Sequence, residues 1–555
     1  MTNTNIEATI TTQNISPTQG NLVAKFSKID LPKTIEMGDR AKVNVKLTNQ
    51  GSTPIVGPVT VKLYTSTDEI IDRAPDGKLV NDALLTSTVQ QVNLLPGQST
   101  KVKLNYGNNT SVGAPGACNL IAEIDLNNGN TKQISQLVSA TGSDVVIDWN
   151  ATALNAIQAE GKAGRGVPPT LGSRLLAITS LSVYDAVNAF DRTYNSYAVN
   201  TPAPIGASEE AAAAAAAHKA LVTLLPNQTA LFDRQLALSL AKINDTPQAE
   251  ADGVAFGNFV ADTIIASRAN DGSTNNAPYV PPAGDYVWRP NTEGANVGVA
   301  VGANWGKVKP FAIPNTAAFA PNGLDGLPGT DRFVQDLEEV RQLGAKQSTA
   351  NTTVTRTPDQ TEIAVFWAYD RPDTFRPYGQ LNQIAQEVAM REETSVPENA
   401  RLFAELNVSL ADAAIVAWDA KYNGKVIQPR PDDVITGGFA AKKGISGTVT
   451  DTEWEPLLNP TPPFPDYTSG HSTFAGAFAG VMTNFFGENY SFTTVSQELP
   501  GVTRTYNSFY DAAYDDAISR VYGGIHVREA TVDDALPTGF AVGNFVAQNL
   551  FKTVV

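Results

Sequence analysis

The stretch Pro463-Phe-Pro-Asp-Tyr-Thr-Ser-Gly-His-Ser472 has the pattern of a loop that leads into a helix. Pro463 and Pro465 stiffen the approach because their rings restrict the backbone. Ser469 and Gly470 stand at the expected turn, and a run of small apolar residues follows His471. A helix that begins here directs free backbone N–H groups and the positive end of its dipole at the loop. The stretch therefore predicts a site for an oxyanion with an imidazole beside it.

Two other stretches carry side chains that complement such a site. Ser519-Arg-Val-Tyr-Gly-Gly-Ile-His526 ends a helical run, and Trp418-Asp-Ala-Lys-Tyr422 is followed by Arg430-Pro431. The chain has only three histidines, and two of them fall in these motifs. Arginine can donate paired N–H bonds to oxyanion oxygens, and lysine adds a point charge. The candidate site residues are Lys421, Arg430, Ser469, Gly470, His471, Arg520 and His526.

Together, these motifs resemble a known three-part signature. Lys followed by Arg-Pro, then Ser-Gly-His, then Ser-Arg-x3-Gly-x-His is similar to the pattern shared by vanadium-dependent haloperoxidases and the type 2 phosphatidic acid phosphatase superfamily. The resemblance covers roughly 145–555, and its last two parts match residue for residue. The first part departs, because more residues separate Lys421 from Arg430 than the family usually has. We interpret this as an insertion, with Lys425 as the competing lysine. Thr468 also stands where the family usually has proline.

The resemblance implies a cofactor and a reaction. Vanadate is expected to be held by the cationic side chains and by one bond from His526, and phosphate or sulfate can occupy the site in its place. His471 would exchange protons with an apical oxygen, and Lys421 would polarise the bound peroxide. Hydrogen peroxide would then oxidise halide to hypohalous acid, which reacts with a small organic acceptor. Phe464 is expected in the substrate pocket, where it resembles chloride-oxidising fungal members more than algal bromoperoxidases, although the halide stays undecided.

Two other functions remain open at this point. The same residues can serve a phosphatase in which His526 forms a phosphohistidine and His471 acts as the general acid. Alternatively, the catalytic region is degenerate and the chain is an adhesion or matrix protein. A haloperoxidase is favoured because the long helical region, Phe464 and the setting of Lys421 look unlike the shorter soluble acid phosphatases.

Length and composition limit the class of protein. A chain of 555 residues is too long for one ordinary core, so two or more domains are expected. The net charge of −16 argues against a nucleic-acid partner. No apolar run is long enough for a membrane span, and no standard signal peptide is visible, so we expect a soluble protein. The compartment, which could be the bacterial cytoplasm or one reached by non-standard export, and any homo-oligomer stay undecided.

The pattern of apolar residues divides the chain into three parts. Residues 1–20 are rich in Thr, Asn and Gln and are predicted to form a disordered tail. Residues 21–142 alternate apolar and polar positions between turn signals, which predicts an all-β immunoglobulin-like sandwich. Residues 143–555 change to a helical period, which predicts a large all-α bundle. The sandwich resembles adhesion-type modules appended to bacterial enzymes, so it is expected to serve either surface or matrix attachment or simple spacing.

Overall fold

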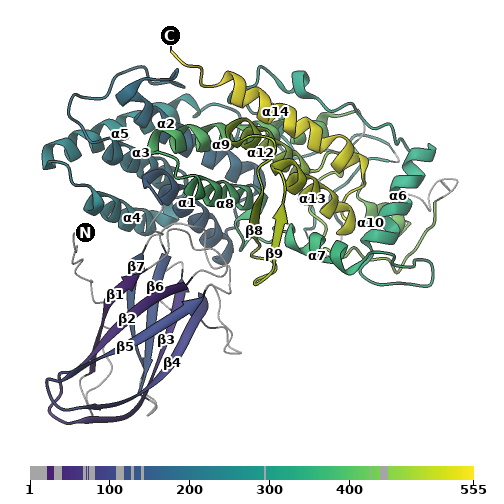
Figure 1. Ribbon diagram of the computed structural model, residues 1–555. Helices are drawn as coiled ribbons and strands as arrows, with labels where there is room; N and C mark the ends of the chain where they lie inside the picture. Colours follow the sequence, from purple (N-terminus) through teal and green to yellow (C-terminus); the bar gives the residue numbers. More distant parts are fainter. Residues whose placement is uncertain are drawn as a thin grey trace. The chain divides into compact units, whose positions relative to one another are not determined.

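The computed structural model forms two compact units (Figure 1). One comprises 1–155 with 389–393, and the other comprises 156–388 with 394–555. The division therefore falls inside the first helix, whereas the change of period places it just before that helix. The structure describes residues 22–30, 40–66, 71, 73, 82–107, 118–126, 131–138, 143–284, 286–292, 296–425, 427–437 and 448–554. The predicted tail at 1–20 lies outside the described residues.

The N-terminal unit contains two antiparallel sheets. Its strands are β1 (Leu22–Asp30), β2 (Arg40–Asn49), β3 (Ile55–Ser66), β4 (Asp82–Leu94), β5 (Ser99–Gly107), β6 (Cys118–Asp125) and β7 (Thr131–Val138). One sheet has the order β1-β2-β5, and the other has the order β4-β3-β6-β7. Side chains such as Val45 and Val61 alternate with polar neighbours along their strands and are fully buried in one core to which both sheets contribute.

The second unit is dominated by helices, as the helical period predicts. Its helices continue from α1 (Val145–Lys162) with α2 (Pro169–Asp191), α3 (Glu209–Leu224), α4 (Thr229–Lys242), α5 (Pro247–Ser267), α6 (Asp331–Gly344), α7 (Pro358–Phe366), α8 (Arg376–Arg391), α9 (Val396–Asn423), α10 (Pro431–Ile435), α12 (Gly470–Phe486), α13 (Phe509–Tyr522) and α14 (Ala535–Asn549). A short hairpin joins α12 to α13 through β8 (Phe492–Val495) and β9 (Thr503–Tyr506). No helix among the described residues is long and apolar enough to cross a membrane.

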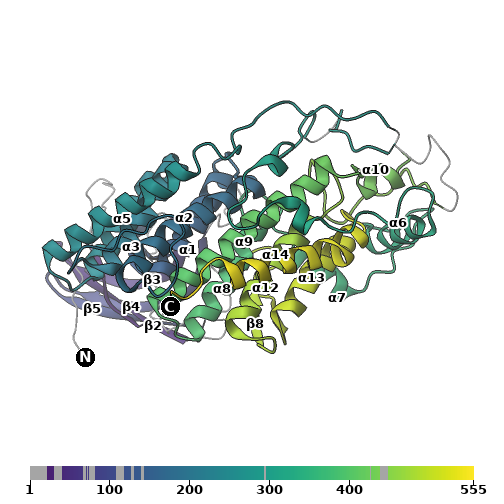
Figure 2. The same ribbon diagram turned by 90° about the horizontal axis from the view of Figure 1, so that it is seen from above.

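Helix α12 lies at the centre of the helical unit and packs on α9, α13 and α14 (Figure 2). The contact with α14 is close because small residues face each other. A Cβ added at Gly476 would lie 2.2 Å from the Leu536 carbonyl oxygen, and one at Gly539 would lie 2.0 Å from the Thr473 carbonyl oxygen. Larger side chains would push the two helices apart. This packing fixes the N-terminus of α12, where the Ser-Gly-His motif lies.

Candidate active site

Helix α12 begins at the Ser-Gly-His motif. Ser469 is its N-cap, and the Ser469 Oγ accepts a hydrogen bond from the Ser472 N–H at 3.3 Å. The cap leaves the Ser469 hydroxyl hydrogen available as a donor. Gly470 is buried against Trp418, because an added Cβ would lie 2.9 Å from that ring. The helix start therefore presents a hydroxyl and backbone N–H groups in a confined space, which favours an anion.

The His526 side chain is buried between a carboxylate and a guanidinium. Its Nδ1 is hydrogen-bonded to the Asp466 carboxylate, and its Nε2 lies 3.0 Å from Arg430 Nη1. A guanidinium only donates hydrogen bonds, so Nε2 must carry a lone pair and Nδ1 must carry the proton. Burial and the nearby positive charge of Arg430 hold the pKa of His526 well below its usual value. The neutral imidazole can therefore bind an electrophilic centre through Nε2.

Lys421 lies near the C-terminus of α9 and is fully buried. Its Nζ donates hydrogen bonds to the carbonyl oxygens of Pro465 at 2.7 Å and Asp466 at 3.1 Å. It also lies 4.8 Å from the centre of the Phe464 ring. Burial, together with the charge of Arg430, lowers the pKa of Lys421 well below its usual value. Lys425, the competing lysine, has an exposed side chain.

Arg520 and His471 meet around a second carboxylate, that of Asp370. Arg520 Nη2 donates to Asp370 Oδ2 at 2.6 Å, and His471 Nε2 lies 4.0 Å from Asp370 Oδ1. The same His471 nitrogen lies 2.9 Å from the Ala368 carbonyl oxygen, so Nε2 carries the proton and Nδ1 carries the lone pair. Burial and the charge of Arg520 lower the pKa of His471 to about 3, although Asp370 opposes the shift.

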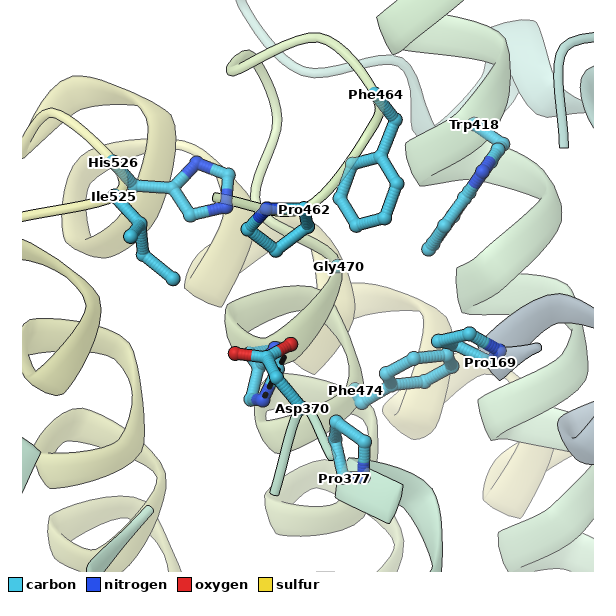
Figure 3. A pocket seen from close by; sticks show the side chains of 11 residues that line it. Pro169, Asp370, Pro377, Trp418, Pro462, Phe464, Gly470, Phe474, Ile525 and His526 are labelled. Atoms are coloured by element: carbon cyan, nitrogen blue, oxygen red, sulfur yellow. Dashed lines mark ion pairs between the residues drawn. The ribbon is translucent and has the colours of Figure 1, made fainter. Parts of the chain in front are cut away.

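A small pocket opens onto these groups (Figure 3). His526 and Gly470 line it together with His471, and Phe464 and Trp418 form an aromatic wall whose ring centres are 5.2 Å apart. Asp370 lies at the opposite side from Phe464 in Figure 3. The pocket thus combines an apolar wall with convergent polar groups, as ligand sites commonly do.

The donors at this site fit a tetrahedral oxyanion. Among the described residues, Arg430 Nη2 and Arg520 Nε are buried and have no hydrogen-bond partner. A buried guanidinium N–H without an acceptor is costly, because it has lost water without a replacement. An oxyanion that accepts from both arginines, from the Ser469 hydroxyl and from the start of α12 would remove this cost. The residues present therefore suit vanadate, phosphate or sulfate.

All seven candidate residues from the three motifs lie in this region, although they come from four separate segments of the chain. Two further carboxylates belong to the site but were not predicted from the sequence: Asp370, which holds Arg520, and Asp466, which holds His526. Asp466 lies within the 463–472 loop, so its place in the sequence, three residues before Ser469, was a signal that could have found it. Asp370 follows α7 in a segment with no motif, so no sequence signal pointed to it.

The known proteins to which this chain is similar are vanadium-dependent haloperoxidases. Residues 401–554 match the family model for the second helical-bundle domain of VCPO. Vanadium chloroperoxidase from Curvularia inaequalis is 24% identical over 497 residues, which cover 71% of this chain and 81% of that protein. The structure of the first bacterial vanadium-dependent iodoperoxidase is 26% identical in sequence and has a TM-score of 0.60. The match covers 73% of this chain and 95% of the iodoperoxidase chain. A holo-type bacterial vanadium-dependent chloroperoxidase shares the fold, with 16% identity, a TM-score of 0.54, and coverage of 69% and 92%.

Proposed function

We propose that this chain, a member of the vanadium-dependent haloperoxidase family, uses vanadate to oxidise halide with hydrogen peroxide to hypohalous acid. The proposal rests on two buried arginines with unused donors beside a neutral histidine, His526. The Nε2 lone pair of His526 accepts from Arg430 Nη1, and it would bind the central atom of the anion when Arg430 turns this donor to an oxygen of the anion. A site of this composition holds an oxyanion and offers one nitrogen ligand to its central atom.

The residues that would hold vanadate follow from these contacts. His526 would supply the nitrogen ligand through Nε2, and the other donors would bind the oxygens. Those donors are Lys421, Arg430, Arg520, the Ser469 hydroxyl and the Gly470 N–H. When bound, vanadate supplies a Lewis-acidic centre that activates hydrogen peroxide without changing its own oxidation state.

His471 is suited to move the proton. Its imidazole is neutral at ordinary pH because its pKa is lowered to about 3, and Nδ1 is the nitrogen that can accept a proton. A bound oxyanion would bring negative charge close to this ring and raise its pKa toward the working range. Asp370 would then stabilise the imidazolium, since its carboxylate lies 4.0 Å from the ring nitrogen.

The phosphatase reaction uses the same groups, but the relatives favour the haloperoxidase. A direct test measures halide-dependent oxidation of a phenolic dye with and without added orthovanadate, beside hydrolysis of a phosphate ester. We expect oxidation that depends on vanadate, peroxide and halide together. Phosphate-ester hydrolysis without any vanadate-dependent oxidation would refute the proposal. Chloride, bromide and iodide tested in parallel would identify the halide.

The N-terminal strands form an immunoglobulin-like sandwich that folds separately from the catalytic unit. Two antiparallel sheets that share one apolar core support this assignment. Expression of 145–555 alone tests the separation: a soluble fragment that binds vanadate is expected. An insoluble fragment, or one without vanadate binding when the full chain has both properties, would show that the boundary or the independence is wrong.

A further inference from the structure

One face of the three-stranded sheet β1-β2-β5 is lined with lysines. Along β2, Val43 and Val45 are buried in the core, whereas Lys42 and Lys46 point to the opposite, outer face. Strand β5 alternates in the same way, and β1 does so as far as Phe26, after which a register shift places Lys28 on the outer face. The lysine face, as we call it, consists of Lys25, Lys28, Lys42, Lys46, Lys101 and Lys103.

The strand register brings these lysines into rows. Lys25 lies opposite Lys46, and Lys46 lies opposite Lys101, so one row crosses all three strands. The next row is Lys28, Asn44 and Lys103. Neighbouring strands are about 4.8 Å apart, and like charges directly opposite each other destabilise a sheet. Sheet stability alone therefore does not explain this arrangement.

The lysine face also contrasts with the rest of the protein. The full chain carries a net charge of −16, yet no acidic side chain is found among the described outward side chains of these three strands. Asp30, at the end of β1, pairs with Lys42 along the backbone, and its side chain lies outside the described set. Positive charge concentrated on an acidic protein creates a local field that attracts anions.

We propose that the lysine face binds an extended acidic polysaccharide that carries carboxylate or sulfate groups. This interaction is separate from the haloperoxidase reaction and would attach the enzyme to an anionic polymer. The repeated point charges of the lysine rows match the repeated charges of such a polymer. Outward Ser27, Asn44 and Asn105 lie between the lysines and add hydroxyl and amide groups that can bond sugar hydroxyls.

Two other anionic partners suit this face less well. Phosphate groups of nucleic acids are commonly bound by arginine, whose planar group donates two parallel bonds. The positive charges among the described outward side chains of the three strands are all lysines, and the side chain of Arg40, at the start of β2, lies outside the described set. A membrane surface would favour apolar or aromatic side chains that enter the bilayer, whereas Val23 is the sole apolar residue among those same outward side chains.

The test uses the full chain and two probe polymers, polygalacturonate and dextran sulfate, with neutral dextran as the blank. Binding is measured on polymer-coated surfaces over a range of salt concentrations. The test variant combines Lys25→Gln, Lys46→Gln and Lys101→Gln. The matched control combines Lys242→Gln, Lys346→Gln and Lys552→Gln, which removes the same charge from the helical unit.

We expect the unsubstituted chain to bind at least one acidic polymer but not neutral dextran, and to release it as salt increases. The test variant should bind about tenfold more weakly or worse, as expected for three exposed charge contacts, while the control keeps its affinity. Haloperoxidase turnover and thermal unfolding should be unchanged in the test variant. If its unfolding temperature falls, Lys46→Gln alone, at the centre of the row, is measured instead.

Several results would overturn the proposal. Equal weakening in the test and control variants would show that total charge, and not the lysine face, determines binding. Absence of binding to both acidic polymers at low salt would exclude the proposed partner. Binding to phosphatidylserine vesicles that depends on the same three lysines, without affinity for either polymer, would assign the lysine face to a membrane surface instead.

Discussion

Replacement of Asp466 by asparagine should weaken vanadate binding through His526. Asp466 is fully buried and accepts the hydrogen bond from His526 Nδ1, while Arg430 Nη1 donates to His526 Nε2 at 3.0 Å. Asparagine has almost the same shape but no charge. The substitution therefore removes the charge that makes the imidazole a stronger ligand, and it weakens the bond that fixes the tautomer.

The expected magnitude is the balance of two opposing effects. Loss of an outer partner of a ligating histidine typically lowers affinity about 10- to 100-fold, equivalent to about 1.4–2.8 kcal/mol. Burial raises the pKa of Asp466 to about 7, although Arg430 and Lys421 oppose the shift, so the carboxylate is charged above that pH. Measured there, removal of its charge makes the site more positive and favours every anion. Sulfate experiences only this second effect, because it forms no bond to His526. The ratio of vanadate affinity to sulfate affinity should therefore fall about 10- to 100-fold.

Both affinities can be measured by calorimetric titration of the unloaded protein, and vanadate binding can be followed independently by vanadium NMR. Asp516→Asn is the matched control, because Asp516 is also buried, with a pKa raised to about 7 by burial, but it lies beside Arg520. That substitution should change the affinities for both anions alike. An unchanged vanadate-to-sulfate ratio in Asp466→Asn would refute the positioning of His526 by Asp466.

The remaining predictions concern the other motif residues. His526→Ala should abolish tight vanadate binding but keep sulfate binding. His471→Ala should keep vanadate binding and lose most dye halogenation. Equal vanadate affinity in His526→Ala and the unsubstituted chain would contradict the assignment of His526 as the ligand. Lys421→Ala should weaken vanadate binding and halide oxidation by at least about tenfold, roughly 1.4 kcal/mol for one charge-assisted hydrogen bond. Lys425→Ala should leave both nearly unchanged, because the Lys425 side chain is exposed. Sulfate affinity should fall as pH rises through the lowered pKa of Lys421, because a bound anion raises that pKa and binding then takes up a proton. Calorimetry over a pH series measures this fall in affinity. If the fall is equally steep in Lys421→Gln, another group titrates.

The helical period was sufficient to predict the helical unit, and the motifs named candidate site residues that the structure brings together. An N-cap serine, a glycine and a histidine before a small apolar run specify a helix start through contacts between near neighbours, and these contacts are readable from sequence. The motif at 519–526 likewise predicted Arg520 and His526 as candidate residues, because both lie within one short segment. The change from a two-residue to a helical period separated strands from helices for the same reason.

Only the tertiary structure decided which groups accompany those residues. Asp370 reaches Arg520, and Asp466 reaches His526, across long stretches of sequence, because helices pack closely and bring loops together. The burial of Lys421 beside the 463–472 loop and the exposure of Lys425 also depend on how α9 ends against that loop. In the N-terminal unit, alternation predicted strands, but the pairing of Lys25, Lys46 and Lys101 follows from strand order and register. Contacts between distant segments depend on the packing of the whole chain, and local sequence patterns do not encode that packing directly.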